Sequence, residues 1–570
     1  MSHLLPSAPI IPLTPLQQGM YFTWLQDPAA GIDIEQMVCT LPEVIDAPRL
    51  RAAWETLTAT HDILRTTFTA EAATIRPTLP TPWQELDLRP STFDVQRSTF
   101  NVSTSPAFPD SPPDSLSAFL EKDRTTPFDL PTGPLQRLTL LRLAPEDYRL
   151  IWTFHHILID GRAITALLRE VFTLYDQAPA VPTPAPTTGA LSNLKSKISN
   201  SPPTPSFQSH NHWQAALDHT SSASFWKAHL TGINGPTPLI VDHLERGFAI
   251  RPGNPSPPTQ AEADLPLPPA LTTSLRTLAT THGLTLNTLV QAAFALLLSH
   301  YSGEDRVIFG ATRACRHTPV TGSENTIGLL INTLPLAVAL PSDQPLLALL
   351  QNLRQHWIDL RPHEHTPLSF IRRTAGLSAP AAPFNHLLVF ENDDYTNTLR
   401  ATGGPAFAQR TFDLHELSSV PLTLAVYGSA SLRLHCAYAP ATFDTDTIQR
   451  LLGHIATLLE QFATLPLTTP LSAYTLTTPA ERQLNASSSS TTASPLTPAS
   501  TPPTPSTACF VKPLPNSLTA SPSPPKTPPG PTRNSTTAPT PSPTPSSRAA
   551  SSPAISSASA WSVAPPSSQP

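Results

Sequence analysis

The chain has 570 residues with 35 basic and 41 acidic side chains, and its net charge of −6 excludes the strongly basic surface of a typical nucleic-acid-binding protein. Its longest apolar stretch, 289–301, is well short of the roughly 20 residues that a membrane span requires, so we expect no membrane and no nucleic-acid partner. We read no secretory signal at the N-terminus, and the four cysteines lack metal-ligand or paired spacing. These features favour a cytoplasmic protein without a bound metal.

Proline is unusually frequent, with 70 residues or about 12% of the chain, against a typical share of about 5%. The excess is concentrated at 105–113, at 178–206 and after about residue 485. We interpret the first two stretches as surface loops or a linker. The segment 485–570 is rich in Pro, Ser, Thr and Ala and lacks Asp and Glu. Because such a composition cannot bury enough apolar surface to fold, we expect a disordered tail.

The first half of the chain mixes helical and extended patterns. Residues 46–68 place Trp54 and other apolar side chains at helical spacing before running into an extended segment. YRLIWTFHH at 148–156 is rich in β-branched and aromatic residues and predicts a strand. Residues 160–177 then carry apolar side chains along one face of a predicted helix.

The second half repeats this mixture. It predicts, in chain order, a helix that stops at Gly283, a more apolar helix and two strands: 270–282, 286–300, 306–312 and 327–340. The fold class is therefore α/β, with two halves of similar size at roughly 1–178 and 207–475.

Two adjacent histidines stand where the strand at 148–156 ends. The sequence HHILIDG at 155–161 follows this strand and precedes a helix, which is where a rigid scaffold presents catalytic groups. Because strand side chains alternate between faces, His155 and His156 should point to opposite sides. Gly161, directly after Asp160, allows a tight turn and the close approach of a ligand.

The chain resembles the condensation domains of nonribosomal peptide synthetases over about residues 10–480. The family's opening signature is matched by PLTPLQQGMYF, and its later elements follow in the family's order. They are THDILRTTF (60–68), HHILIDG (155–161), FQSHNHW (207–213), IGLLINT (327–333), HEHTPL (363–368) and FNHLLVFEN (384–392). One departure is Thr60, where the family usually has arginine.

The resemblance implies a pseudo-dimer of two chloramphenicol-acetyltransferase-like halves with the active site in a tunnel between them. The expected organisation is an N-terminal half, a Pro-rich linker, a C-terminal half, the remnant of a linker to an adenylation domain, and a disordered tail: 1–178, 179–206, 207–475, 476–484 and 485–570.

The reaction implied is attack by the amine of a carrier-bound aminoacyl group on a carrier-bound acyl or peptidyl thioester. The product is an amide, and the chain would be an acyltransferase. Its expected partners are donor and acceptor peptidyl carrier proteins and other synthetase modules. No cofactor is expected on the chain itself, because the carrier proteins deliver the phosphopantetheine arms.

Four residues of HHILIDG are the candidate catalytic set. An α-amine has a pKa near 8, and His156 is suited to take its proton or to position it. Both roles stay open, since orienting two substrates accounts for much of such an acceleration. By resemblance, His155 supports the site, Asp160 pairs with Arg316 to hold the loop, and Gly161 keeps the tunnel open for the pantetheine arm.

Three further residues match family motifs but are interpreted as structural. Arg65 and Asn332 are expected to support the site through local contacts. Trp213 is expected to pack in the core.

Other members of the superfamily are less consistent with this sequence. Epimerization domains carry an extra glutamate near the arginine region, and GATRACRHTP at 310–319 has none. Heterocyclization domains replace the first histidine by aspartate, and His155 excludes that reading. Plant-type acyl-CoA transferases carry DFGWG near the C-terminus, which is absent here. An ester-forming acyltransferase and a catalytically silent docking domain remain the alternatives.

The family resemblance stops abruptly near residue 485. LSAYTLTTPAERQL at 471–484 resembles the linker that leads into an adenylation domain, and the acid-free tail follows at once. One explanation is a natural disordered tether. The other, which we favour, is a reading-frame break in a GC-rich gene, with the adenylation domain encoded in another frame. Resequencing the locus distinguishes the two.

Both explanations predict that 485–570 does not contribute to folding. A chain truncated after residue 484 should keep the melting temperature of the full chain, because the removed segment has too few apolar residues to pack. Differential scanning calorimetry of the two chains measures this. A clear loss of stability in the shorter chain would show that the tail packs on the rest of the protein.

Overall fold

The computed structural model describes residues 10–89, 115–177, 206–239, 260–377, 383–417, 420–428 and 430–483. The described residues belong to one unit, Met1–Ala493. The proline-rich stretch at 105–113, the predicted linker 179–206 except for Ser206, and the tail 485–570 lie outside the described residues, so these expectations stay predictions.

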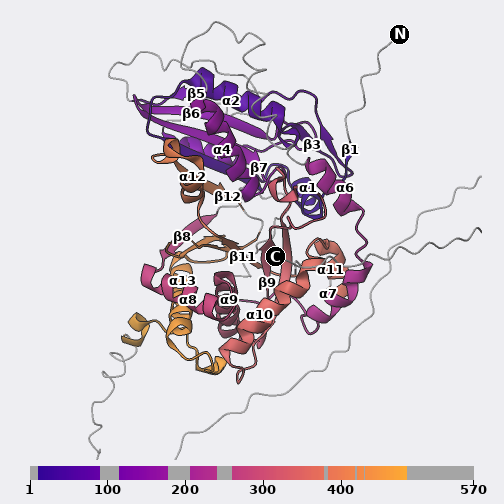
Figure 1. The fold of residues 1–570 in the computed structure, drawn as a ribbon, viewed down its shortest axis with the longest axis vertical. Helices are drawn as coiled ribbons and strands as arrows, with labels where there is room; N and C mark the ends of the chain where they lie inside the picture. Colours follow the sequence, from indigo (N-terminus) through magenta and orange to yellow (C-terminus); the bar gives the residue numbers. More distant parts are fainter. Residues whose placement is uncertain are drawn as a thin grey trace, which may run out of the picture. The chain divides into compact units, whose positions relative to one another are not determined.

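The first lobe is built around a five-stranded sheet with the spatial order β12-β2-β7-β6-β5. Its strands are β2 (Ile34–Leu41), β5 (Trp83–Asp87), β6 (Gln136–Ala144), β7 (Asp147–His155) and β12 (Thr411–Glu416). Figure 1 shows four of these strands, β5, β6, β7 and β12, in the upper part of the molecule. A small sheet, β1-β4-β3, comprises β1 (Ile10–Ile11), β3 (Thr66–Phe68) and β4 (Ala73–Ile75). Its helices include α1 (Pro15–Gln26), α2 (Ala47–Thr60), α3 (Leu116–Arg124) and α4 (Gly161–Gln177).

The helix and strand predictions for this lobe are confirmed at α2, β7 and α4. The side chain of Asp46 accepts a hydrogen bond from the N–H of Arg49, which caps the start of α2. Trp54 of α2 and Trp152 of β7 pack with their ring centroids 4.9 Å apart in the lobe's hydrophobic core. The apolar face of α4 is buried in the same core.

The second lobe contains a six-stranded sheet with the order β10-β9-β11-β13-β14-β8. Its strands are β8 (Ala261–Pro266), β9 (Arg306–Arg313), β10 (Asn332–Ala339), β11 (His386–Glu391), β13 (Leu422–Tyr427) and β14 (Arg433–Tyr438). Its helices include α7 (Ala223–His229), α8 (Pro269–Thr281), α9 (Leu286–Ser302), α10 (Leu346–Leu360), α11 (Leu368–Ala375) and α13 (Thr445–Thr464), and α6 (Phe207–Ala215) precedes them. The predictions at α8, α9 and β9 are confirmed.

The strand predicted over 327–340 starts later than expected, at Asn332. The preceding residues use their backbone groups for a different contact. The N–H of Leu330 donates to Asp160 Oδ2 at 3.0 Å, and the carbonyl of Gly328 accepts from the N–H of Asp160 at 3.3 Å. A residue from the other lobe thus replaces the strand's hydrogen bonds here.

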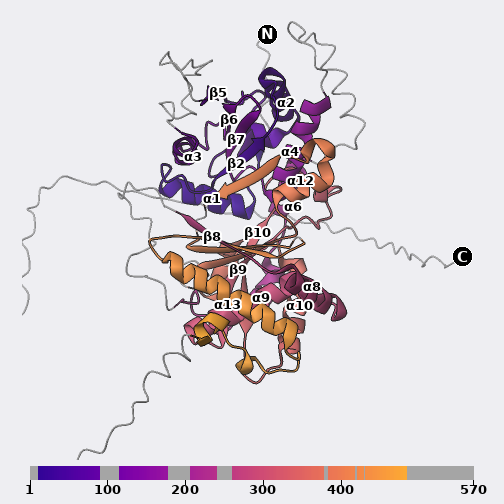
Figure 2. The ribbon, with the colours of Figure 1, turned by 90° about the vertical axis from the view of Figure 1, so that its left-hand side faces the viewer.

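One segment from the second half of the sequence lies in the first lobe. The predicted division into two halves did not anticipate this crossing. The helix α12 (Tyr395–Gly403) and strand β12 lie in the first lobe, beside α4 (Figures 1 and 2). β12 pairs antiparallel with β2. Between them, Arg410 is buried, and it binds the carboxylates of Glu43 at 2.7 Å and Asp176 at 2.8 Å. This ion-pair cluster anchors the crossing segment, α12 with β12, to the first lobe.

Among the described residues, no single helix has the length and apolar composition to cross a membrane, and α8 and α9 meet that test only as a pair bent by 107°.

Several histidines are buried without charge in the second lobe. His386 on β11 is fully buried, and its Nε2 lies 3.1 Å from the carbonyl oxygen of Thr237. Burial lowers the pKa of His386 to about 4. Burial likewise lowers the pKa values of His210, His356 and His365 to about 4.

Acid should therefore weaken the fold as the pH falls from about 6.5 to about 4. In this range the unfolded chain binds protons at histidines that stay neutral in the native chain. For His386 alone, the free energy of unfolding should drop by about 2 kcal/mol between pH 7 and pH 5. Urea titrations at these pH values measure the drop. The free energy of unfolding of His386→Gln should depend less steeply on pH than that of the wild type, whereas the control His282→Gln, changed at an exposed site, should match the wild type. Equal slopes for all three proteins would contradict the conclusion that His386 is neutral in the folded chain.

Candidate active site

The first histidine of the pair, His155, is the last residue of β7 and is almost completely buried. The N–H of Ile157 donates to its Nδ1 at 3.1 Å, so this nitrogen acts as an acceptor. Burial, and secondarily the neighbouring charge of His156, lowers the pKa of His155 to about 3. His155 is therefore a neutral side chain that accepts a hydrogen bond within the loop, and its supporting role in the reaction stays a prediction.

The second histidine, His156, lines a large cavity. Its backbone N–H donates to the carbonyl of Asp33 at 2.8 Å. Its Nδ1 lies 2.9 Å from the carbonyl oxygen of Ile159 and 2.9 Å from Oε1 of Glu35. Because both partners are acceptors only, Nδ1 carries a proton in either charge state. Nε2 is then the ring nitrogen left for a reacting group.

The environment of His156 favours its charged form. Burial by itself would lower the pKa of His156, but the carboxylate of Glu35, and more weakly those of Glu416 and Asp33, outweigh this effect and raise it to about 10. At neutral pH the imidazole is then a cation with a proton on Nε2. This arrangement disfavours the proton-acceptor role and leaves Nε2–H as a hydrogen-bond donor; whether His156 positions the amine stays a prediction.

Glu35 was not identified from the sequence. It is the second residue of β2, and only 2% of its side chain is exposed. The one available signal was a charged residue inside the largely apolar run IEQMVCTL. A buried carboxylate needs a partner, but the sequence does not say that this partner is His156.

The carboxylate of Asp160 joins the two lobes. It accepts two contacts from Nη2 of Arg316, at 2.5 and 2.7 Å, and both side chains are buried. It also accepts from the N–H of Ala163 at 3.1 Å, which caps α4, and from the N–H of Leu330 at 3.0 Å. Nη1 of Arg316 donates to the carbonyl of Thr326 at 2.6 Å. The expected pair is present, and it holds the loop after His156 in place.

Gly161 is the first residue of α4 and lines the same cavity. Its φ angle is not in the left-handed region, so the turn does not by itself require glycine. A Cβ atom here would lie 3.0 Å from the hydroxyl oxygen of Tyr395. The absence of a side chain thus leaves space between α4 and α12. That this space is a passage for a pantetheine arm stays a prediction.

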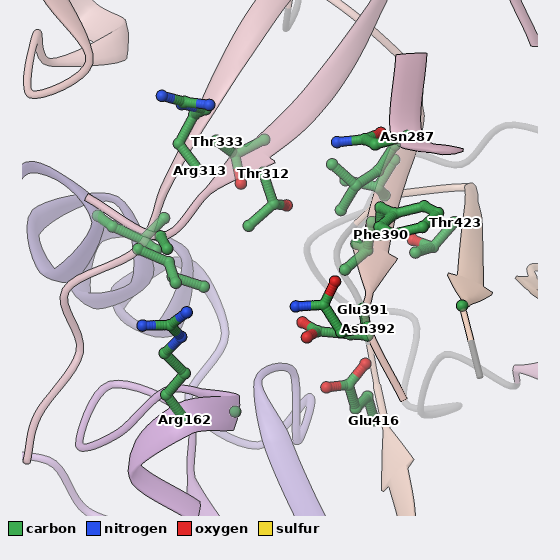
Figure 3. A pocket seen from close by; sticks show the side chains of 18 of the residues that line it. Arg162, Asn287, Thr312, Arg313, Thr333, Phe390, Glu391, Asn392, Glu416 and Thr423 are labelled. Carbon is green, nitrogen blue, oxygen red and sulfur yellow. The ribbon is translucent and has the colours of Figure 1, made fainter. Parts of the chain in front are cut away.

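The cavity lies between the lobes and has a volume of about 1420 Å³. Residues from both lobes line it, among them Met20, Asp33, Glu35, His156, Gly161, Arg162, Asn287, Thr312, Phe390, Glu391 and Glu416. Figure 3 shows Glu391, Asn392 and Glu416 together on one side and Arg162 reaching in from the other. We call Glu35, Glu391 and Glu416 the acidic wall.

Arg65 lies away from the cavity and holds a turn together. Its guanidinium donates to the carbonyl oxygens of Thr58 at 2.9 Å and Arg76 at 2.7 Å. It also pairs with Asp62 at 2.6 Å. These are local structural contacts.

Asn332 and Trp213 also lie outside the cavity lining. The side-chain amide of Asn332 donates to the carbonyls of Glu364 at 2.9 Å and Thr366 at 3.1 Å, which fixes the start of β10. Trp213 was expected in the core, but it is only partly buried, because α6 lies at the surface. Its ring packs edge-on against His365, with centroids 4.8 Å apart.

Among the described residues, no group of three or more His, Cys, Asp and Glu side chains has an arrangement that could hold a metal ion.

Comparison with known proteins finds one family throughout. A family model described as "Condensation domain" matches residues 7–484. A component of the linear gramicidin synthase of Brevibacillus parabrevis is 31% identical over 80% of this chain and 6% of its own length. A component of the mycosubtilin synthase of Bacillus subtilis is 27% identical over 79% of this chain and 16% of its own length. The chain spans less than a fifth of the length of either relative.

Solved structures show the same fold. The X-domain in its complex with OxyB from teicoplanin biosynthesis has a TM-score of 0.62 at 20% identity, covering 84% of this chain and 99% of that one. A mutant of the starter condensation domain of rhizomide synthetase has a TM-score of 0.58 at 19% identity, covering 82% and 99%. These likenesses support the two-lobed architecture.

Asp160→Ala should lower stability strongly, because it leaves the buried guanidinium of Arg316 without its partner. The expected loss in the free energy of unfolding is about 3–5 kcal/mol. Glu55→Ala, which breaks the exposed Arg51–Glu55 pair, should cost no more than about 0.5 kcal/mol. Chemical denaturation of both variants measures the difference. A stable but inactive Asp160→Ala protein would argue instead that Asp160 takes part in the reaction directly.

Proposed function

The chain belongs to the condensation-domain family of nonribosomal peptide synthetases, and we propose that it joins a carrier-bound acyl or peptidyl thioester to the amine of a carrier-bound aminoacyl group. The product is an amide, and the donor's carrier is released with a free thiol. The partners are a donor and an acceptor carrier protein, together with other synthetase modules.

The arrangement of His156 carries this proposal. Its Nδ1 is held by Glu35 and by the carbonyl of Ile159, and its Nε2 is left for the cavity between the lobes. A side chain held this firmly and placed on a cavity wall is arranged for chemistry rather than for packing.

The size of the cavity supports a reaction with two large substrates. Pockets for one small ligand are typically about 300–1000 Å³, and this cavity reaches about 1420 Å³. Two pantetheine arms with their acyl groups need such a volume. The arms enter as substrates on the partner proteins, with no cofactor held by this chain.

The charge of His156 indicates how it acts. During aminolysis of a thioester, negative charge develops on the carbonyl oxygen of the tetrahedral intermediate. A fixed imidazolium with a proton on Nε2 stabilises that charge by donating a hydrogen bond. His156 is thus assigned to the electrophilic side of the reaction, together with the orientation of the two substrates.

The two alternatives are less well supported. A silent docking domain has no need for a buried Glu35–His156 pair that faces a cavity. An ester-forming acyltransferase binds a neutral hydroxyl group, whereas the acidic wall attracts a cation such as a protonated amine.

His156→Ala should reduce amide formation by at least about 100-fold while the fold persists. The assay combines a carrier protein loaded with a labelled N-acyl-aminoacyl donor and a panel of aminoacyl-loaded acceptor carriers, with products measured by mass spectrometry. His282→Ala is the matched control, because His282 is exposed and does not line the cavity. Near wild-type turnover by a folded His156→Ala protein would refute the assignment of His156. No amide from the wild type with any acceptor would refute the proposed function.

A further inference from the structure

Two members of the acidic wall face each other across neighbouring strands. Glu416, the last residue of β12, is paired in register with Glu35 of β2. Residues opposite each other in an antiparallel pair point to the same side, with Cβ atoms about 4.5–5.5 Å apart. Two carboxylates so placed repel each other, and the imidazolium of His156 beside Glu35 offsets this repulsion only in part. Such a local conflict is typical of a functional site.

A second observation indicates that something binds here. Oε2 of Glu35 is buried and has no hydrogen-bond partner among the described residues, while Oε1 is bound to His156. A buried oxygen without a partner is destabilising until a donor satisfies it. Glu35 lines the cavity, so a small shift of its side chain would bring this oxygen to a donor that enters there.

The surroundings favour a cation that is organic rather than a metal. The charged and titratable groups facing Glu416 are Glu35 from β2, His156, Glu391 from β11, Glu262 from β8, Tyr395 from α12 and Tyr427 from β13. Arg162 reaches in from the opposite side and acts on Glu391. Carboxylates outnumber these two cationic groups. No metal-holding geometry is formed by the described side chains. An alkylammonium group supplies both positive charge and several N–H donors.

We propose that Glu416 and Glu35 bind the ammonium group of the acceptor substrate, and that Glu416 removes its proton before the amine attacks the donor thioester. This inference rests on the proposed function and adds to it the binding site for the amine and the group that accepts its proton. It explains why the site tolerates a charged His156, which has no free nitrogen to accept that proton.

Proton transfer and bond formation balance in this scheme. The ammonium transfers one proton to the carboxylate of Glu416 and becomes a neutral amine. Its nitrogen forms a bond to the thioester carbonyl carbon, while Nε2–H of His156 stabilises the oxyanion. The C–S bond then breaks, and the thiolate leaves with the second proton from the attacking nitrogen. The products are the amide and the pantetheine thiol, and Glu416 returns its proton to solvent.

The position of Glu416 suits proton transfer near neutral pH. Although its side chain is open to the cavity, it lies deep between the lobes, and this loss of bulk solvent, with repulsion from Glu35, raises its pKa to about 7. A group that titrates near the working pH exchanges protons with an amine of pKa near 8 without a large penalty.

The test measures the pH dependence of Glu416→Gln with the donor carrier described above and an aminoacyl-pantetheine thioester as soluble acceptor. At pH 7 we expect kcat/KM for the acceptor to fall at least about tenfold, because only about a tenth of an amine with a pKa near 8 is already deprotonated there and can react. The rate of the variant should rise steeply with pH below pH 7 and level off above about pH 8, as the amine loses its proton to solvent. The KM for the donor should not change. Glu304→Gln is the control, since Glu304 is an exposed carboxylate that does not line the cavity.

A second measurement tests the binding site without relying on rate. A pantetheine thioester with hydrogen in place of the α-amine serves as a competitive inhibitor of the acceptor. The wild type should bind the amine-bearing acceptor more tightly than this analogue, and Glu416→Gln should lose the preference.

Chemical rescue covers the case in which Glu416→Gln is poorly folded. Added acetate should restore turnover in Glu416→Ala, because a free carboxylate takes the place of the missing base, and a purely structural role would not produce this response. A wild-type rate and pH profile in Glu416→Gln, or no rescue of a folded Glu416→Ala, would overturn the inference. The wild type would still form the amide in that case, so the proposed function would stand.

Discussion

The buried ion pair between Asp160 and Arg316 is the contact on which the site depends. A carboxylate in this position is stable only with full compensation, and it receives hydrogen bonds from Arg316, Ala163 and Leu330. These donors belong to three segments of both lobes. The side chain of Asp160 thus caps α4, accepts a hydrogen bond from the irregular stretch before β10 and joins the two lobes.

The orientation of His156 follows from this contact. Asp160 is directly preceded by Ile159, whose carbonyl oxygen lies against Nδ1 of His156. Glu35, on the neighbouring strand, supplies the second acceptor. The imidazole is therefore fixed by one partner that depends on the lobe interface and by another that belongs to the sheet. The same carboxylates that keep it charged make the cavity attractive to a positively charged substrate.

Local patterns were sufficient to predict the main elements and the loop that carries His156. The helices at 160–177 and 286–300 have periodic apolar faces, and their boundaries in the structure agree closely. The Asp160–Arg316 pair was inferred from family resemblance. Glu416 could not be inferred, because its place beside Glu35 depends on a strand from the second half of the sequence pairing with a strand from the first half. Such long-range pairing leaves no periodic signal, and the late start of β10 has the same kind of cause.

The crossing of α12 and β12 into the first lobe has a consequence for engineering and for recombination between genes. A chimera made by joining the first half of one synthetase domain to the second half of another would place a foreign strand against β2. Arg410 would then need matching carboxylates at positions 43 and 176 in the unrelated half. The residues that must come from one parent are thus the first lobe together with α12 and β12, although about 230 residues of chain separate α4 from Arg410. A chimera designed from these contacts would take residues 395–416 from the N-terminal parent, which needs a crossover on each side of this segment besides the one between the halves.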